Sequence, residues 1–546
     1  RKGPVTIEES RLNREMRGNY NKDGKIGEPA KRMQTMFETL LSLSKRILYL
    51  MVTTAMLTFS AQAVYAESKG GVLKFATPSA RPGLDPAATR TGDAYMLTAM
   101  IFSNLTRVSH ELKPEPQLAS SWEANAAGDE WTFNLVKNAK FHNGRPVTAA
   151  DVKYSIDRIL DPATASKGAK ALGPIDEVIA KDDHTVVFKL KGPYADLALQ
   201  LGNTFARIVA KENIDEIANK PIGSGPFVLK EYVPGSKAIL VKNKDYFEEG
   251  LPYLDEVHQI FIKEYAAQVS ALKTGEIDIM YFAPPEIIPE LEGDPNVEVK
   301  VVSAPSFQPL LMWGGVKPWD DVRVRQAFRF AIDRETMMAA ATGGMGVLGN
   351  DSPVSPSNPY YNANLPQRKQ DVKKAKKLLA EAGYPNGIDI TLYTSTQRPG
   401  LEPAAVVAQQ TLAKSGFRVK IESVEIRRLY KEIIPNPQEM ATSHNNWFGR
   451  PTIDESLTPF YYTGSNWNYT KYSNPEVDRL LDEARALTKF EERKPLYDKV
   501  QEILYNEGPD VVPYFKNYVS ANRKEVKNYK LIPVQYVDLR DTWVER

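Results

Sequence analysis

The chain of 546 residues contains no cysteine, only five histidines and no apolar run long enough to cross a bilayer. Without cysteine it can form no disulfide, no thiol nucleophile and no cysteine-ligated metal site. Positive and negative charges nearly cancel, at a formal net charge of +2, so nothing in the charge balance indicates nucleic-acid binding. The isolated histidines, none in the spacing of a metalloprotease, are His110, His142, His184, His258 and His444.

Enzymatic motifs are also scarce. The glycines of Gly344–Gly349 fit the spacing of a dinucleotide-binding loop, but they follow a predicted helix and run into another loop, so we expect no cofactor there. No serine stands in the Gly-x-Ser-x-Gly turn of an α/β hydrolase. Only His444 keeps a small chance of a metal role, as a contact to a metal chelate. These motifs therefore give no support to an enzyme that uses a dinucleotide cofactor or a serine nucleophile.

The start of the chain predicts export. Residues 1–32 are rich in Arg, Lys, Asn and Gly, which is typical of a disordered segment or of upstream sequence that is not part of the native protein. The segment 33–66 has the pattern of a signal peptide: the basic pair Lys45-Arg46, the apolar run Ile47–Phe59, and small residues before a cleavage site expected after Ala66. The thirteen apolar residues fall short of the roughly 20 that span a bilayer.

The predicted location is the periplasm. A lipid anchor needs a cysteine at the cleavage site, so we expect a soluble protein that is not a lipoprotein. Residues 1–66 hold eleven Lys and Arg against six Asp and Glu, which leaves the mature part near −3. Its roughly 480 residues exceed what one core usually serves, so two or three lobes are expected. An α/β fold is predicted by strands that alternate with helices: Val72–Phe75, Thr185–Leu190, Ile388–Tyr393 and Val419–Val424.

The stretch Trp131–Arg158 combines the signals of a strand, a turn and a helix. Apolar and polar residues alternate from Trp131 to Leu135, Asn143-Gly144 predicts a turn, and Thr148 predicts a helix N-cap, with Asp151 near the positive helix end. The residue sequence of this stretch resembles that of the extracytoplasmic solute-binding proteins, family 5, which serve bacterial ABC importers for peptides, nickel, opines and related solutes.

Further segments extend the resemblance to about residues 70–546. One of them, Asp321–Met337, resembles the most regular helix of the family and is predicted as a single helix. The others, in chain order, are Pro221–Phe227, Lys242–Phe247, Lys373–Gly387, Asn474–Ala484 and Glu492–Phe515.

The resemblance implies a type II periplasmic-binding-protein fold with an extra lobe, three lobes in all, that closes about a hinge. Lobe I would comprise residues 70–109, 222–305 and 511–546. Lobe II would be residues 110–221, and lobe III residues 306–510. The ligand would lie between lobes I and III.

Three segments bear on the ligand. The first contains Arg90, Thr91 and Gly92, at the positions where peptide-binding members present backbone and small polar groups; Tyr95 is a weaker candidate. The second contains Arg398, which matches the arginine that holds the ligand carboxylate in dipeptide-type members. A guanidinium can bind a carboxylate or phosphate with two parallel hydrogen bonds. The aromatic residue that these members carry two positions later is Gly400 here.

The third segment departs most from the peptide-binding pattern. Trp447 and Gly449 are kept, but Arg450 stands where those members have the aspartate that pairs with the peptide ammonium. A cation opposite a cation is costly in a desolvated cleft, so we expect ordinary peptides to be rejected. The alternative is an internal salt bridge from Arg450 to Asp454 or Glu455. That bridge would neutralise the charge of Arg450 and remove the reason to expect that peptides are rejected.

Several arginines in one cleft predict an anionic ligand: a phosphorylated sugar, an opine or a sugar-acid conjugate, or a di- or tricarboxylate. Trp447, Trp313 and Trp467 could provide flat apolar faces, although core packing is the alternative for the last two. Asn446 and Asn468 are candidate hydrogen-bond partners.

The predicted function is therefore that of a monomeric solute-binding protein without cofactor or metal, which delivers its ligand to an ABC permease. A binder of acidic or atypical oligopeptides is an alternative within the same class, and a secreted hydrolase of a charged sugar conjugate is an alternative from another.

Overall fold

The computed structural model describes residues 69–78, 83–89, 92–166, 168–450, 452–465, 467–534 and 537–545, and a few residues before them. The predicted upstream segment and signal peptide, 1–32 and 33–66, lie almost wholly outside these residues. Among the residues that are described, no helix has the length and apolarity to cross a membrane. The chain divides into two compact units, Arg1–Ser68 and Lys69–Arg546, and every strand of the described residues lies in the second.

The largest sheet has eight strands. β1 runs parallel to its neighbours β10 and β11, and the other pairs are antiparallel. In spatial order the strands are β12 (Val297–Phe307), β19 (Tyr514–Arg523), β11 (Ile279–Met280), β1 (Val72–Thr77), β10 (Glu256–Phe261), β9 (Lys237–Lys242) and β8 (Phe227–Val233), with β14 (Gly346–Leu348) paired to β19.

Two further sheets come from separate parts of the chain. One has four antiparallel strands, β4 (Ala119–Ala124), β5 (Glu130–Leu135), β7 (Thr185–Leu190) and β6 (Ile175–Asp182). The other has five, β16 (Phe417–Ser423), β15 (Ile388–Thr394), β17 (Ala441–His444), β13 (Leu310–Leu311) and β18 (Asp510–Val511). Two short ribbons pair β2 (Thr106–Val108) with β3 (Pro114–Pro116) and β20 (Val526–Lys527) with β21 (Trp543–Val544).

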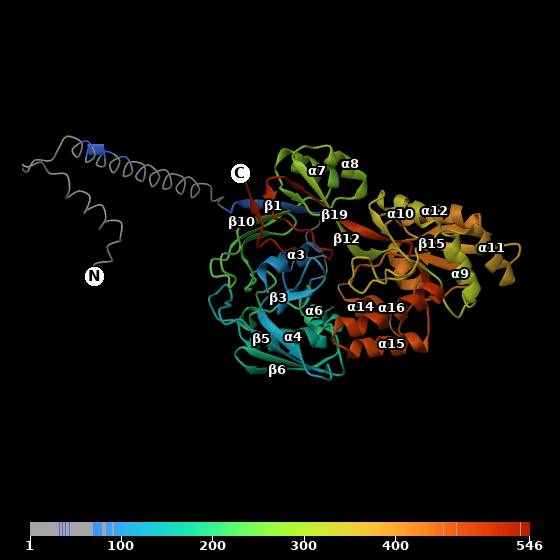
Figure 1. Cartoon of the computed structure of the whole chain (residues 1–546), viewed down its shortest axis with the longest axis horizontal. Helices are drawn as coiled ribbons and strands as arrows, with labels where there is room; N and C mark the ends of the chain where they lie inside the picture. The colour runs from blue at the N-terminus through green and yellow to red at the C-terminus, as the bar shows by residue number, and fades with distance from the viewer. Residues whose placement is uncertain are drawn as a thin grey trace, which may run out of the picture. The chain divides into compact units, whose positions relative to one another are not determined.

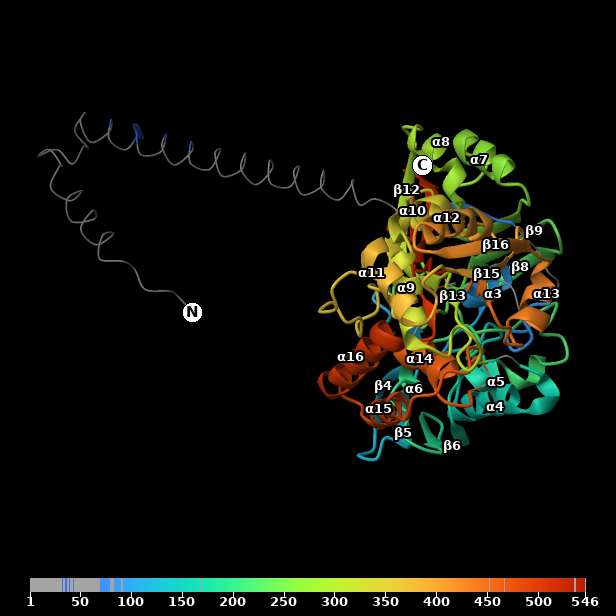
Figure 2. The same cartoon turned by 90° about the vertical axis from the view of Figure 1, so that its right-hand side faces the viewer.

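Helices accompany each sheet (Figures 1 and 2). Those near the large sheet are α3 (Gly92–Ile101), α7 (Tyr265–Thr274) and α8 (Ile288–Glu292). With the four-stranded sheet lie α4 (Ala149–Leu160), α5 (Gly168–Ala171) and α6 (Leu197–Gln200). The region of the five-stranded sheet carries α9 (Val322–Ala331), α10 (Arg334–Thr342), α11 (Val372–Glu381), α12 (Leu401–Ala413), α13 (Ile426–Arg428), α14 (Ile453–Tyr461), α15 (Pro475–Ala486) and α16 (Phe490–Glu507).

The α/β prediction is confirmed, and so are the four predicted strands, which correspond to β1, β7, β15 and β16. The stretch Trp131–Arg158 forms β5, a turn with Gly144 at φ 86°, and α4. The Asp151 carboxylate accepts hydrogen bonds from the backbone N–H and the hydroxyl of Thr148, at 2.9 and 3.0 Å. Most strands of each large sheet fall in one predicted lobe, but β14 of the eight-stranded sheet falls in predicted lobe III. The lobe boundaries remain a prediction.

The prediction of a single helix over Asp321–Met337 was wrong. The chain forms α9 and α10 instead, because Ile332 is extended, with ψ 127°, and the Asp333 carboxylate accepts the Thr336 N–H at 3.1 Å as the N-cap of a new helix. Aspartate is a strong N-cap residue, and this cap outweighs the continuous apolar periodicity across the break.

The chain returns to the large sheet through a close approach of two backbones. A Cβ on Gly223 would lie 2.0 Å from the carbonyl oxygen of Ile101, and one on Gly225 would lie 2.5 Å from that of Met100. Only glycine fits at these two positions, which explains the Gly-Ser-Gly sequence just before β8.

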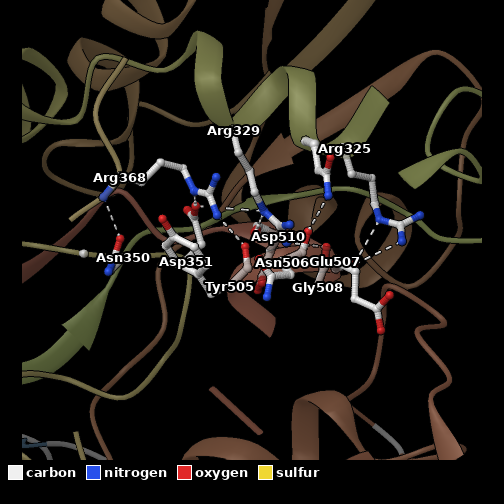
Figure 3. Close-up of polar contacts among 12 residues, drawn as sticks. Arg325, Arg329, Asn350, Asp351, Arg368, Tyr505, Asn506, Glu507, Gly508 and Asp510 are labelled. Atoms are coloured by element: carbon white, nitrogen blue, oxygen red, sulfur yellow. Dashed lines mark hydrogen bonds and ion pairs between the residues drawn. The ribbon is translucent and has the colours of Figure 1, made fainter. Parts of the chain in front are cut away.

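The C-terminal end of α16 is capped by side chains of neighbouring segments (Figure 3). A helix leaves its last four carbonyls without partners, and cations are favourable there. Here Arg325 donates to Glu507 O at 3.0 and 3.2 Å, and Arg329 donates to Gly508 O. The other caps are Gln326 to Asn506 O at 3.1 Å and Arg368 to Tyr505 O at 2.5 Å.

The buried carboxylate of Asp351 balances the charge of two of these arginines and of Arg334. Both oxygens of Asp351 accept hydrogen bonds from Arg334 at 2.7 Å, and Arg368 forms an ion pair with Asp351 at 2.7 Å. Arg329 follows at 4.0 Å. Burial alone would raise the pKa of Asp351, but the three guanidiniums hold it below its usual range.

Substitution Asp351→Asn should therefore destabilise the protein. It leaves three buried guanidiniums without a counter-charge, and we expect a loss of about 3–5 kcal/mol in the free energy of unfolding. Urea denaturation followed by circular dichroism measures it. Asp389→Asn is the matched control, because Asp389 pairs with Arg418 on an exposed surface and the substitution should leave the free energy of unfolding nearly unchanged. Equal losses in both variants would contradict this role of Asp351.

Candidate functional site

The candidate site lies where two antiparallel strands pass from the large sheet to the five-stranded sheet. β12 pairs with β19 along almost its whole length, with Ser306 opposite Lys516 and Phe307 opposite Phe515. Both strands then continue into neighbours in the other sheet, β12 into β13 and β18 into β19. Side chains at this passage can therefore contact both regions.

Gln308, which follows β12, joins three segments at the passage. It is fully buried, and its amide nitrogen donates to Pro399 O at 3.0 Å and to Asn446 Oδ1 at 3.1 Å. Its amide oxygen accepts the Tyr514 hydroxyl at 2.6 Å. Gln308 thereby fixes the loop that carries Arg398, the segment after β17 and the start of β19.

Two cations meet beside Gln308. Lys516, in β19, donates to Asn446 Oδ1, and its pKa is lowered to about 8, by burial first and then by the positive charge of Arg398. Arg398 is exposed and also influences Tyr430, whose hydroxyl donates to Asn446 O at 2.8 Å. Within the described part of the chain, no carboxylate oxygen lies within 4 Å of either cation. The described residues therefore offer these two positive charges no negative counter-charge.

Gly400, two residues after Arg398, has no room for a side chain. Its φ is 87°, and a Cβ there would lie 2.6 Å from the carbonyl oxygen of Ala341 and 3.1 Å from Gln308 Oε1. The aromatic residue of the dipeptide-type pattern is therefore sterically incompatible with this loop.

Trp447 is fixed beside the cations by backbone and ring contacts. Its N–H and carbonyl bond the backbone of Phe307 at 2.9 and 3.1 Å. Its ring stacks on Tyr469, with centroids 6.2 Å apart and planes inclined by 9°, and packs against Phe460 at 5.1 Å. Gly449 packs against Pro305, since a Cβ on it would meet Pro305 Cγ at 2.4 Å.

Arg450 lies over the exposed ring of Trp467, with its guanidinium carbon 5.0 Å from the ring centroid. The anticipated salt bridge to Asp454 is not formed, because Asp454 pairs with Arg485 at 3.1 Å. Arg450 interacts electrostatically with Glu455 instead. Burial raises the pKa of Glu455 to about 7, and the positive charge of Arg450 lowers it. Glu455 Oε2 is buried and has no hydrogen-bond partner among the described residues.

The remaining predicted residues near the start of α3 include two that the structure does not describe. Arg90 and Thr91 lie outside the described residues, and Gly92 begins α3. Tyr95 donates to Thr89 O at 3.4 Å, and its ring meets Phe205 edge-on at 5.5 Å.

Trp313, Asn468 and His444 have internal partners. Trp313 is fully buried in the core of the five-stranded sheet, where its indole N–H donates to Ile434 O at 3.1 Å. Asn468 donates to Tyr462 O at 3.1 Å and to Tyr472 O at 2.7 Å, so it organises its own loop. Burial lowers the pKa of His444 to about 4, and its Nδ1 bonds Leu401 O at 3.0 Å. No cluster of metal-binding side chains occurs in the described ranges.

Three residues of the site were not predicted: Gln308, Lys516 and Phe448. Phe448 lies between Trp447 and Gly449 and is more than half exposed, which is unusual for a large apolar side chain. The sequence contains only a weak indication of Lys516. It stands between Phe515 and Tyr518 in an apolar strand, and a lysine is seldom buried, so its position is unusual.

The four-stranded and five-stranded regions also touch. Asp196, just before α6, forms a buried ion pair at 2.7 Å with Arg493 of α16. Gln200 of α6 lies 3.5 Å from the Thr452 hydroxyl at the start of α14. This contact lies close to Glu455, whose pKa is also affected by Asp196.

Comparisons with known proteins agree on one family. Residues 113–469 match the bacterial extracellular solute-binding proteins, family 5 (middle). The glutathione-binding protein GsiB of Pectobacterium atrosepticum is 27% identical over 496 residues, which cover 88% of this chain and 95% of that protein.

Two solved structures are similar to this chain in three dimensions as well as in sequence. The periplasmic binding protein DppA of Helicobacter pylori, in complex with the peptide STSA, superposes with a TM-score of 0.73 at 29% identity over 88% of this chain and 100% of that one. AgaA of A. tumefaciens R10, in complex with agropinic acid, gives a TM-score of 0.71 at 27% identity over 87% and 99%.

The raised pKa of Glu455 predicts a stability that depends on pH. The folded protein retains a proton on Glu455 up to pH about 7, whereas the unfolded chain loses it near pH 4.3, so this residue reduces stability as the pH rises through that window. Glu455→Gln should be neutral near pH 4.5 and stabilising by about 1–2 kcal/mol at pH 8. Urea titrations at both values measure it, with Glu432→Gln on an exposed helix as the control. A difference that stays constant with pH would refute this account of Glu455.

Proposed function

The chain belongs to family 5 of the bacterial extracellular solute-binding proteins, and we propose that the solute it captures is a small anion. It is a periplasmic solute-binding protein of an ABC importer, with the type II fold and an additional lobe, and it is not an enzyme. A secreted hydrolase is therefore excluded, and the open question is the ligand.

The observation that carries the proposal is the pair of cations formed by Arg398 and Lys516. A desolvated cation is unfavourable unless an opposite charge or hydrogen-bond acceptors compensate it. Among the described residues, the buried Lys516 has only the neutral amide of Asn446 as a partner, and the exposed Arg398 has no carboxylate oxygen within 4 Å. An anionic group on the ligand would satisfy both, with the Arg398 guanidinium binding two of its oxygens and Lys516 acting as a point charge.

The rest of the ligand would lie against aromatic side chains. Trp447 is partly exposed, and Phe448 and Trp467 are exposed beside it. Flat apolar faces suit the ring or carbon chain of a sugar or sugar-acid conjugate. Among the three proposed classes (phosphorylated sugar, opine and sugar-acid conjugate), the opine class gains support from the agropinic acid bound in the structure of AgaA.

A second candidate is an acidic or atypical oligopeptide. The buried Glu455 Oε2 without a partner could accept a ligand ammonium, the role that Arg450 at the family's aspartate position cannot serve. The glutathione-binding relative and the peptide in DppA are consistent with this alternative. A peptide with an additional carboxylate would meet both the cation pair and Glu455.

The proposed mechanism is a shift between open and closed states. The monomeric protein would bind the anion in the open state, close about β12 and β19, and present the closed form to the permease. The buried pair Asp196–Arg493 would form on closure, since it joins the proposed lobes II and III. The proposed export signal, cleavage after Ala66 and absence of a lipid anchor place this cycle in the periplasm.

Substitution of Arg398 tests the proposal directly. Calorimetric titration with agropinate, a hexose phosphate, glutathione and a neutral tetrapeptide should show binding of at least one anion. In Arg398→Ala its affinity should fall about 10-fold or more, the loss expected for a charge-assisted hydrogen bond. Arg418→Ala removes an exposed arginine elsewhere and should leave the affinity unchanged. Tight binding of the neutral peptide, insensitive to Arg398→Ala, would refute an anionic ligand.

The affinity for the anion should also depend on pH. Lys516 has a pKa of about 8 in the free protein, so it loses its charge as the pH rises through that value, and the bound anion would raise its pKa again. The dissociation constant should therefore increase between pH about 7 and about 9.5. Lys516→Gln should bind more weakly at pH 7 and lose most of this dependence. An unchanged pH profile in Lys516→Gln would assign the dependence to another group.

A further inference from the structure

A second cavity opens in the region of the five-stranded sheet, away from the passage between the sheets. It has a volume of about 270 Å³. Its walls come from the turn after β13, from α9, from the segment before α15 and from the end of α16; the residues used below are Arg325, Lys471, Tyr472, Asn474 and Glu507. The cavity can hold a few non-hydrogen atoms.

The cavity lies at the opposite end of β13 from Gln308. Gln308 precedes β13 at the candidate site, whereas Gly314, which lines the cavity, follows it by three residues. None of the residues that line the cavity belongs to the candidate site at the passage.

Arg325 forms one wall as a cation without an ion pair. Its guanidinium donates only to backbone oxygens, those of Glu507 and, at 2.6 Å, of Trp319. Within the described ranges no carboxylate oxygen lies within 4 Å of it. Figure 3 shows it beside the end of α16, and burial lowers its pKa. The positive charge is retained at neutral pH because arginine remains protonated.

Tyr472 provides a buried hydroxyl with little internal satisfaction. Its side chain is 8% exposed, and its hydroxyl makes no hydrogen bond of normal length among the described residues, although Asn474 lies near enough to lower its pKa. Burial raises its pKa to about 12, so the hydroxyl stays protonated and can donate. A buried hydroxyl that is unsatisfied is costly, and an acceptor in the cavity would relieve that cost.

The charges around the cavity favour a monoanion. Arg325 and Lys471 contribute two positive charges, and Lys471 is exposed without an ion pair in the described part of the chain. Glu507 contributes one negative charge, held by Asn474 at 2.6 Å. Asn474 also caps α15, so the positive end of that helix borders the cavity. The net charge of the lining groups is thus +1.

We propose that this cavity is a second binding site, for a small monocarboxylate that accepts hydrogen bonds from Lys471 and the Tyr472 hydroxyl. Dianions are disfavoured by Glu507. The site is independent of the anion proposed for the passage between the sheets, so either proposal can fail alone.

Acetate is the probe for the test. Saturation-transfer NMR of the acetate methyl group, titrated against purified protein, measures its affinity. Lys471→Gln should weaken acetate about 10-fold and Tyr472→Phe by several-fold, because each removes one hydrogen bond to the carboxylate. Lys376→Gln removes an exposed lysine on α11 and is the matched control, with unchanged affinity expected.

Arg398→Ala separates the two sites. If acetate binds to the cavity, this variant should bind it as the wild-type protein does. Three results would overturn the proposal: no acetate binding to the wild-type protein, loss of binding in Arg398→Ala, or affinities in Lys471→Gln and Tyr472→Phe equal to that of Lys376→Gln. Sulfate should compete poorly, and stronger binding of sulfate than of acetate would contradict the choice of a monoanion.

Discussion

The three hydrogen bonds of Gln308 are the constraint on which the candidate site depends. They join the loop before α12, the segment after β17 and the start of β19, which are far apart in the sequence. Because Gln308 is fully buried, each bond that is lost would leave a polar group unsatisfied. The positions of Arg398, Asn446 and Lys516 relative to one another follow from this one side chain, and the pairing of β12 with β19 places it between the two sheets.

The contrast between two groups of cations supports the proposed site. The arginines near Asp351 are buried and compensated, by that carboxylate and by the carbonyls that end α16 (Figure 3). Arg398 and Lys516 have neither form of compensation in the described part of the chain. Because Lys516 is buried without a carboxylate beside it among the described residues, an anionic group on a ligand would compensate its charge. Arg450 is intermediate, because Glu455 offsets part of its charge.

The sequence predicted local structure well where local chemistry decides it. Alternation in β7 and β15 and the Thr148–Asp151 cap depend on neighbouring residues, whereas the break at Asp333 was hidden by an apolar period that continued across it. Arg398 was found through the resemblance to a family. Lys516 was not, because its burial arises only when β19 meets the segment after β17. Trp313 and Trp467 have the same side chain, and only the tertiary structure buries the first and exposes the second.

In the proposed cycle, the ligand would drive closure, and the contact between lobes would not. Arg158 binds Asp85 and would tie the proposed lobe II to lobe I, so the pair Asp196–Arg493 would separate when the proposed lobe III swings away. A buried ion pair gains in Coulomb energy roughly what it loses in desolvation. This pair would therefore fix how the proposed lobes meet and would add little net stability. A ligand shifts the equilibrium only by its difference in affinity for the two states. An anion that contacts Arg398 on one side and Lys516 of the crossing strand on the other would supply such a difference, because only the closed state brings both cations to the same ligand.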